Sequence, residues 1–223
     1  MKRLSICIPV FNKYSFTEKC LLDLSKLPND HEIIVVDNGS SDETFKKLNE
    51  SKEIKYFRLK ENKGFAYASN ISYGLSEAPN VLFLNNDIAV IKNKENWTNE
   101  LLKYCDTHIV GPTMGQLDSN FNFIKEANEE LTGNSYMSGW CLASSKENWK
   151  KLIIPRGQVF SEDFFCYFED TDLSFRARKL KMPFKVVNIP VIHFGKQTSK
   201  QLNTHQLYSN AREIFIKKWK NKV

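Results

Sequence analysis

The densest group of side chains that could do chemistry lies late in the sequence, where Glu169, Asp170 and Asp172 follow an aromatic run at residues 164–168. Carboxylates in the first turn of a helix also act as caps and offset the helix dipole, so any one of them has a structural explanation. Three carboxylates that directly follow such an apolar segment favour a functional role. A carboxylate beside an aromatic wall can act as a general base and take a proton from an attacking hydroxyl group.

Asp87 and His193 form a second candidate group, because each follows an apolar run that we expect to be a strand. Carboxylate oxygen is the hard ligand that Mg²⁺ or Mn²⁺ prefers, and such an ion can bridge a diphosphate. Asp87 also fits an ordinary turn of Asn and Asp, and a lone histidine after a strand is more often a hydrogen-bonded structural residue.

Polar segments follow two earlier apolar runs. Residues 37–42 carry Asp37 followed by glycine and hydroxyl side chains, and residues 61–65 carry an amide, a lysine and a glycine before a helical pattern. Such loops can hold a base or a ribose and can bind an anion at a helix N-terminus. A turn role for Asp37 and an ordinary helix start at Gly64 fit the residue types equally well. The absence of a GxGxxG pattern argues against a dinucleotide-binding dehydrogenase.

The elements that would position these residues alternate between strands and helices in the first part of the chain. Short apolar runs rich in Ile and Val predict strands buried on both faces of a parallel sheet. Ligands of such sheets sit beyond the carboxyl ends of the strands, where the polar segments lie. The expected strands are residues 4–10, 32–36, 54–59 and 81–84, and the expected helices are residues 15–27, a segment starting at the capping signal 40–43, and residues 65–75.

The regular alternation of strands and helices ends in the second part of the chain. A strand at 108–111, a polar stretch of weak periodicity at 116–130 and a strand-like run at 136–144 indicate antiparallel additions, and a further strand is expected at 186–192. We therefore predict an α/β fold with an open, mostly parallel sheet, helices on both faces and a small antiparallel addition. One domain is expected over residues 1–223, with a nucleotide-binding half at 1–90 and an acceptor-binding and catalytic half at 91–223.

The composition suits one soluble domain. The 223 residues are 41% hydrophobic, which is enough for one core. No apolar run approaches the roughly 20 residues that a membrane span needs, and residues 4–11 are interpreted as a strand rather than as part of a signal peptide. Five scattered cysteines without CxxC spacing predict a reduced, cytoplasmic protein.

The net charge of +6 is a small excess of 32 basic over 26 acidic residues and indicates anionic partners only weakly. The densest basic stretch is Lys217, Lys218, Lys220 and Lys222, which follows apolar positions in an amphipathic pattern. A solvated helix face is the first interpretation. Peripheral contact with an anionic membrane surface, or with a nucleic acid, is the alternative.

The order and spacing of five motifs resemble the family 2 glycosyltransferases, which have the GT-A fold. The resemblance covers nearly the whole chain, and five ordered motifs are far more specific than any one of them. The Asn-Asn-Asp form of the metal motif, the FFxYxEDxDLxxR segment and a late histidine make the chain look most like rhamnosyltransferase-type members. The motifs are residues 5–12, 33–42, 61–65, 82–87 and 169–176.

The resemblance implies a role for each matched position. Asp170 would be the base that deprotonates the acceptor, with Glu169 supporting it, and Asp87 and His193 would hold Mn²⁺ or Mg²⁺ on the diphosphate. The residues that would contact the donor sugar or the acceptor are Gly139, Trp140 and Arg176. The residues that would bind the nucleotide are Pro9, Val10, Phe11, Asn12, Asp37, Asn38, Gly39, Asn62, Lys63, Gly64, Asn85 and Asn86.

The implied reaction is inverting transfer of a sugar from a nucleotide-diphosphate sugar, of the dTDP-rhamnose or UDP-sugar type. The acceptor would be a hydroxyl group of a surface glycan or a lipid-linked saccharide. A modified nucleic-acid base is the alternative acceptor, and a non-catalytic nucleotide- or glycan-binding module is the rival class. Asn85 stands where many relatives have Asp, which leaves the metal affinity and the choice between the two ions open.

Overall fold

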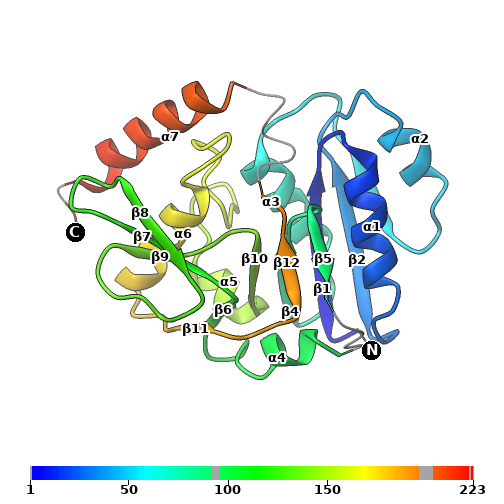
Figure 1. Cartoon of the computed structure of the whole chain (residues 1–223), viewed down its shortest axis with the longest axis horizontal. Helices are drawn as coiled ribbons and strands as arrows, with labels where there is room; N and C mark the ends of the chain where they lie inside the picture. The colour runs from blue at the N-terminus through cyan, green and yellow to red at the C-terminus, as the bar shows by residue number, and fades with distance from the viewer. Residues whose placement is uncertain (1, 92–95, 196–202, 221, 223) are drawn as a thin grey trace.

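A seven-stranded sheet forms the centre of the computed structural model, which describes every residue except 1, 92–95, 196–202, 221 and 223 (Figure 1). The strand order is β11-β6-β10-β4-β1-β2-β3. β1 to β4 run parallel to one another, whereas β10 is antiparallel to both β4 and β6. The bounds are Leu4–Val10 for β1, His31–Asp37 for β2, Lys55–Arg58 for β3, Asn80–Leu84 for β4, Ile109–Gly111 for β6, Cys141–Ser145 for β10 and Phe184–Val186 for β11.

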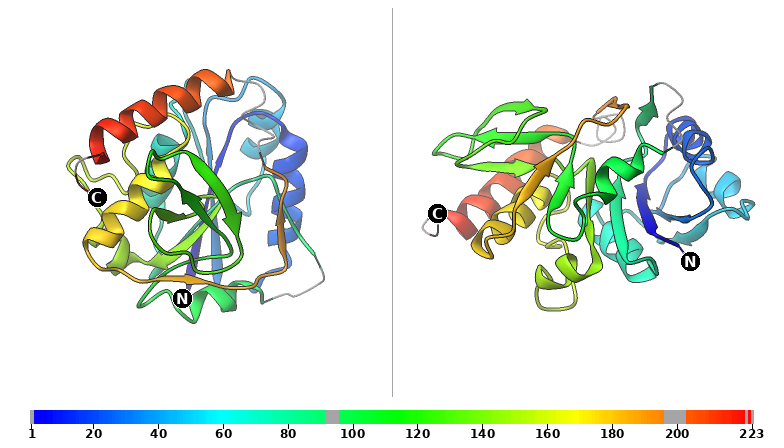
Figure 2. Two further views of the ribbon diagram at one scale, coloured as in Figure 1. Left: turned by 60° about the vertical axis from the view of Figure 1, so that its left-hand side comes forward. Right: turned by 90° about the horizontal axis from the view of Figure 1, so that it is seen from below.

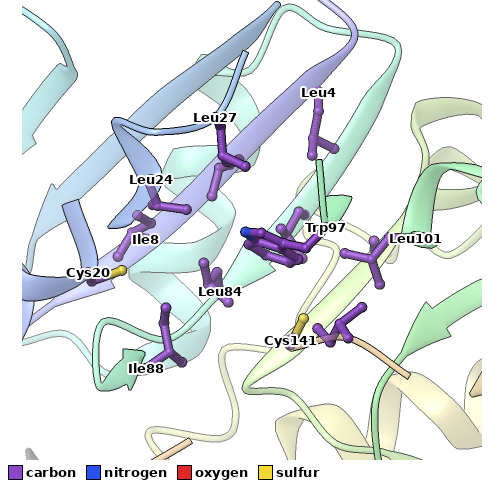
Figure 3. Close-up of a cluster of buried hydrophobic side chains, with 14 of the residues drawn as sticks. Leu4, Ile8, Cys20, Leu24, Leu27, Leu84, Ile88, Trp97, Leu101 and Cys141 are labelled. Carbon is purple, nitrogen blue, oxygen red and sulfur yellow. The ribbon is translucent and has the colours of Figure 1, made fainter. Parts of the chain in front are cut away.

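Helices cover both faces of this sheet. Side chains alternate along β1, so Ile6 and Ile8 belong to one buried cluster and Cys7 to the other. Cys20 of α1 and Leu101 of α4 lie in the cluster of Ile8 (Figure 3), whereas α3, α5 and α6 contribute to the cluster on the opposite face. The helices are Tyr14–Leu24 for α1, Thr44–Asn49 for α2, Phe65–Leu75 for α3, Thr98–Leu102 for α4, Lys146–Lys151 for α5, Glu169–Lys179 for α6 and Thr204–Trp219 for α7.

Two small antiparallel sheets complete the fold. One has the order β8-β7-β9, with β7 at Met114–Leu117, β8 at Phe123–Ala127 and β9 at Ser135–Met137; the other pairs β5 at Ile88–Val90 with β12 at Val191–His193. The three-stranded sheet and α7 lie at the same end of the molecule (Figures 1 and 2). α7 packs on α6 through aromatic contacts such as Phe215 against Phe175, and no helix in the described part of the chain is long and apolar enough to cross a membrane.

The predicted fold class is confirmed, and each strand predicted in the first part is present. Two later segments, each expected to form one strand, are each divided between two strands of different sheets. Residues 136–144 form β9 and β10 with a turn between them, because the chain must pass close to α6: a Cβ atom at Gly139 would lie 2.9 Å from the Cβ of Asp170. Residues 186–192 are shared by β11 and β12, and Pro190 between them cannot donate a ladder hydrogen bond.

Candidate active site

A cavity of about 800 Å³ opens where the parallel strands β1 and β4 end. Its walls are the loops after β1, β2 and β4, the turn between β9 and β10, the start of α6 and one face of the three-stranded sheet. Most of the residues predicted from the sequence line it together. These residues are Pro9, Val10, Phe11, Asn38, Asn62, Gly64, Asn85, Asn86, Asp87, Gly139, Trp140, Glu169, Asp170 and His193.

Asn38 joins two of the loops predicted to bind the nucleotide. Its side-chain Oδ1 accepts a hydrogen bond from the Lys63 backbone N–H at 2.8 Å, and its side-chain Nδ2 donates to the Gly64 backbone carbonyl at 3.0 Å. Gly64 has a φ of +91°, and a Cβ atom there would lie 2.3 Å from the carbonyl oxygen of Phe165. Only glycine therefore allows this loop to approach the segment that leads into α6.

Asn12, Asp37, Gly39 and Lys63 do not line the cavity, although the sequence predicts them to bind the nucleotide. Asp37 is fully buried and accepts hydrogen bonds from the Ser40 backbone N–H at 2.8 Å and from a tyrosine hydroxyl on β3 at 3.0 Å. The side-chain oxygen of Asn12 accepts from the backbone of the loop after β2. Both side chains hold the loops in shape, because their hydrogen bonds run within the protein.

Arg176, predicted to contact the donor sugar or the acceptor, and Asp172 both lie outside the residues that line the cavity. The guanidinium group of Arg176 donates to two carbonyl oxygens and to Asp172 Oδ2 at 3.0 Å, and Arg176 does not line the cavity. Asp172 is fully buried and its Oδ1 receives Lys218 Nζ and the Trp219 indole N–H, each at 2.8 Å. These contacts anchor α7 on α6. Lys218 is thus engaged by the protein rather than projecting freely from a basic face.

Asp87 and His193 meet although they are 106 positions apart in the sequence. Asp87 Oδ1 lies 3.0 Å from His193 Nε2, and the Asn85 amide nitrogen lies 3.2 Å from the same ring atom. The pairing of β5 with β12 brings them together, since His193 is opposite Ile88. Trp140 stacks on the imidazole with 4.9 Å between ring centres and an angle of 10°, which fixes the orientation of the ring.

The chemistry of this group fits a divalent cation. Asp87 has a carboxylate oxygen and His193 an imidazole nitrogen at the cavity, and both atom types are ligands that could hold Mn²⁺ or Mg²⁺. The Asn85 side chain could add its oxygen if the amide is turned over. Among the described residues, no group of three or more His, Cys, Asp or Glu side chains is arranged to hold a metal.

Glu169 and Asp170 begin α6 beside one another. Glu169 is 8% exposed, and its Oε2 is buried without a hydrogen-bond partner in the part of the chain that the structure describes. Burial raises the pKa of Glu169 above its ordinary value, and the charge of Asp170 raises it further. Asp170 Oδ2 accepts the Gly139 N–H at 2.8 Å and Oδ1 accepts the Thr171 N–H at 2.7 Å. Burial nevertheless raises the pKa of Asp170.

A fourth carboxylate, Glu126 of β8, also lines the cavity and was missed by the sequence analysis. Its Oε1 accepts hydrogen bonds from the hydroxyl groups of Thr113 at 2.8 Å and Ser138 at 2.5 Å. The stretch 116–130 has no clear periodicity because β8 is exposed along nearly its whole length. Its pairing with β7 is what brings Glu126 to the cavity.

The sequence matches the model of a described protein family over residues 5–153, and that family is Glycosyl transferase family 2. Over 93 residues it is 31% identical to the teichoic acid poly(glycerol phosphate) polymerase of Staphylococcus epidermidis. This match covers 39% of the present chain and 13% of the polymerase, so the chain spans a small part of that relative. The rhamnosyltransferase-type resemblance stays a prediction.

Two solved structures have the same fold over most of the chain. GalNAc-T7 with UDP, GalNAc and Mn²⁺ has a TM-score of 0.69 at 16% identity, over 86% of this chain and 43% of that one. Residues 1–349 of TarS from S. aureus have a TM-score of 0.62 at 14% identity, over 99% and 73% of the two chains. The fold is the GT-A fold, and since the family model covers more than half of the sequence, the chain belongs to glycosyl transferase family 2.

Proposed function

We propose that this chain is a metal-dependent, inverting glycosyltransferase that moves a sugar from a nucleotide-diphosphate donor to an acceptor hydroxyl group. The observation that carries the proposal is the presence, in one cavity, of the Asp87–His193 pair and the Glu169–Asp170 pair. One pair suits a cation, and the other contains carboxylates of raised pKa. Family membership, and relatives solved with UDP or with GDP-Man and Mn²⁺, support the same reaction.

The donor occupies the side of the cavity formed by the loops after β1, β2 and β4. Asn38, Asn62 and Gly64 hold the nucleoside, while Asp37 and Asn12 act indirectly by holding these loops in shape. Asp87, His193 and the Asn85 side chain hold the divalent cation. When bound, this ion supplies positive charge to the diphosphate as the diphosphate leaves.

The acceptor hydroxyl approaches from the side of α6. Asp170 takes the hydroxyl proton while the oxygen forms a bond to the anomeric carbon, and the electron pair of the glycosyl–phosphate bond leaves with the diphosphate. Attack from the face opposite the leaving group inverts the configuration at that carbon. The Gly139 and Thr171 donors orient Asp170, and the raised pKa of the carboxylate makes it a better proton acceptor.

The sugar donor and the acceptor are assigned from the family and from the relatives. A dTDP-rhamnose or UDP-sugar donor and a surface-glycan or lipid-linked saccharide acceptor fit a cytoplasmic enzyme of glycan assembly. The name of the polymerase relative, which refers to teichoic acid, supports a role in making a cell-surface polymer. A rival, non-catalytic module on the same fold would bind donor without ever cleaving it.

A thermal-shift panel of nucleotide sugars, with and without Mn²⁺ or Mg²⁺, tests this function. A ligand that binds only the native state at a hundredfold excess over its Kd adds roughly 3 kcal/mol of stability, which raises the melting temperature. We expect one nucleotide sugar to raise it only when the metal is present, and Asp87→Ala to lose this effect. The donor found in this way is then assayed for hydrolysis. Lack of any metal-dependent shift or hydrolysis would refute the proposal.

A further inference from the structure

The chain enters α6 through two aromatic residues in an uncommon backbone conformation. Tyr167 has a φ of +71°, and Phe168, the N-cap of α6, has a φ of +63°. Bulky side chains are strained in this left-handed region, which glycine adopts freely. Such outliers persist only where surrounding contacts hold them, and they cluster at functional sites. Glu169 and Asp170 follow directly, so the conformation of this pair sets the direction in which both carboxylates leave the chain.

A second left-handed pair, Asn12 and Lys13, precedes α1 and is supported in a different way. Asparagine tolerates this region better than most residues, and Asn12 Oδ1 accepts the Ser41 backbone N–H at 2.8 Å. Phe168 has no polar side-chain atom with which to hold its own conformation. The strained turn before α6 therefore depends on packing.

Tyr208 of α7 supplies part of this packing. Its ring centre lies 5.7 Å from that of Tyr167 and 5.3 Å from that of Phe168, so one ring contacts both strained residues. The ring of Phe215, farther along α7, lies 5.1 Å from that of Phe168. Residues seven positions apart share one face of a helix, so a single face of α7 supports the turn. Tyr208 also lines the cavity.

Asp170 is held tightly on its other side by the turn between β9 and β10. The Gly139 N–H donates to Asp170 Oδ2 at 2.8 Å, and a Cβ atom at Gly139 would lie 2.9 Å from the Cβ of Asp170. A shift of the start of α6 would either break this hydrogen bond or press the two segments together. Displacement of a reacting group by about 1 Å can cost about 10²-fold in rate.

We infer that Tyr208 is a positioning residue for the proposed base: its ring holds Tyr167 and Phe168 in the left-handed conformation that places Asp170 against Gly139. The inference rests on the proposed function and adds to it a residue of α7, which no sequence motif connects to α6. Tyr208 acts through the strained turn, so its effect is on the rate of the chemical step rather than on donor binding.

Metal-dependent hydrolysis of the donor tests the inference, because water then replaces the acceptor and offers no sugar ring for Tyr208 to contact. The probe is the UDP- or dTDP-sugar with the largest metal-dependent thermal shift. In Tyr208→Ala we expect kcat to fall by about tenfold or more, with the donor KM and the thermal shift close to wild type. α7 should stay docked, because Asp172 binds Lys218 and Trp219 independently. Tyr208→Phe, which keeps the ring, should retain most of the rate.

Relief of the strain is a readout that a purely structural role of Tyr208 would not give. Glycine adopts a positive φ without strain, so adding Tyr167→Gly to Tyr208→Ala should raise kcat again by about threefold or more. Ile214→Ala is the matched control, because it removes an apolar side chain from the same helix at a position that is 37% exposed and outside the cavity. It should leave kcat unchanged.

The inference is wrong, while the proposed function stands, if Tyr208→Ala folds and keeps the wild-type kcat, if its loss lies in the donor KM, or if Tyr167→Gly restores nothing. Should Tyr208→Ala fail to fold, Tyr208→Leu takes its place with the same expectations, because leucine keeps apolar volume without the flat ring. A wild-type protein that neither binds nor hydrolyses any nucleotide sugar with metal would refute the proposed function, and the inference with it.

Discussion

Glu32 and Glu169 are buried to the same extent, each with 8% of its surface exposed, yet their surroundings are opposite. Glu32 lies near the start of β2, at the end of the sheet away from the cavity. Its Oε1 accepts hydrogen bonds from the backbone N–H groups of Glu77 at 2.7 Å and Ala78 at 3.0 Å and from the Ser5 hydroxyl, and its Oε2 pairs with Lys55 Nζ at 2.8 Å.

These partners outweigh burial, so the pKa of Glu32 is lowered to about 2. Glu169 has one oxygen that finds no hydrogen-bond partner among the described residues and a second carboxylate beside it, and burial and that charge raise its pKa. Burial alone therefore does not determine the protonation state of a carboxylate; the hydrogen-bond donors and charges around it decide together with burial. A carboxylate with a hydrogen-bond or ion-pair partner on each oxygen stabilises the fold, whereas a buried carboxylate that lacks such partners keeps a raised pKa.

The largest expected effect concerns the Glu169–Asp170 pair, the carboxylates of raised pKa. Asp170→Asn should lower the rate of transfer by about 10²–10⁴-fold, because the amide cannot accept the acceptor proton. Donor binding should survive, since Asp170 lies in the first turn of α6 and apart from the loops assigned to the nucleotide. Initial rates with saturating acceptor, together with the metal-dependent thermal shift, measure the two effects. Full turnover by this variant would overturn the assignment of the base.

Glu32→Gln tests the carboxylate that has partners on both of its oxygens. The pKa of Glu32 is about 2 in the folded protein against 4.5 for an ordinary glutamate, so its ionised form stabilises the fold above pH 4.5 and this contribution is lost as the pH falls towards 2. Allowing for the partial exposure of Lys55, we expect a loss of about 2 kcal/mol in the free energy of unfolding at pH 7.

Urea unfolding of wild type and Glu32→Gln at pH 7 and pH 3 measures this difference, which should shrink at the lower pH. Catalytic rates of the folded variant should match wild type, because Glu32 does not line the cavity. An equal loss of stability at both pH values would show that the charge of Glu32 is not the stabilising factor.

An effect of opposite sign is expected for Glu169→Gln. Its raised pKa means that the folded protein holds a proton that the unfolded chain releases, so wild-type stability falls as the pH rises from about 4.5 into the neutral range. The variant lacks this penalty and should be more stable than wild type at pH 8, with no such gain at pH 4. Urea midpoints at the two pH values measure it; a loss at pH 8 would contradict the unsatisfied burial of Glu169.

Much of the site was predictable because its signals are local. Apolar runs that end in polar turns locate β1, β2 and β4 and hence the loops after them, and an aromatic run before a helical pattern locates Glu169 and Asp170. These signals depend on residues within one turn or one strand of each other. The sequence alone therefore determined the parallel half of the sheet, the loops at its carboxyl edge and the catalytic candidates at the start of α6.

Only the tertiary structure distinguished carboxylates of the same type from one another. Asp37 and Asp172 resemble site residues in sequence, but each also has a distant partner, on β3 and on α7 respectively, which no local pattern connects to it. Glu126 is the opposite case, because the sequence analysis missed it and the structure places it at the cavity. Its exposed strand carries no periodicity, and only pairing with β7 brings it there. Local sequence indicates which strand end or helix start carries an acidic residue. Its function depends on which distant donors surround it, and these are brought there by the folding of the chain.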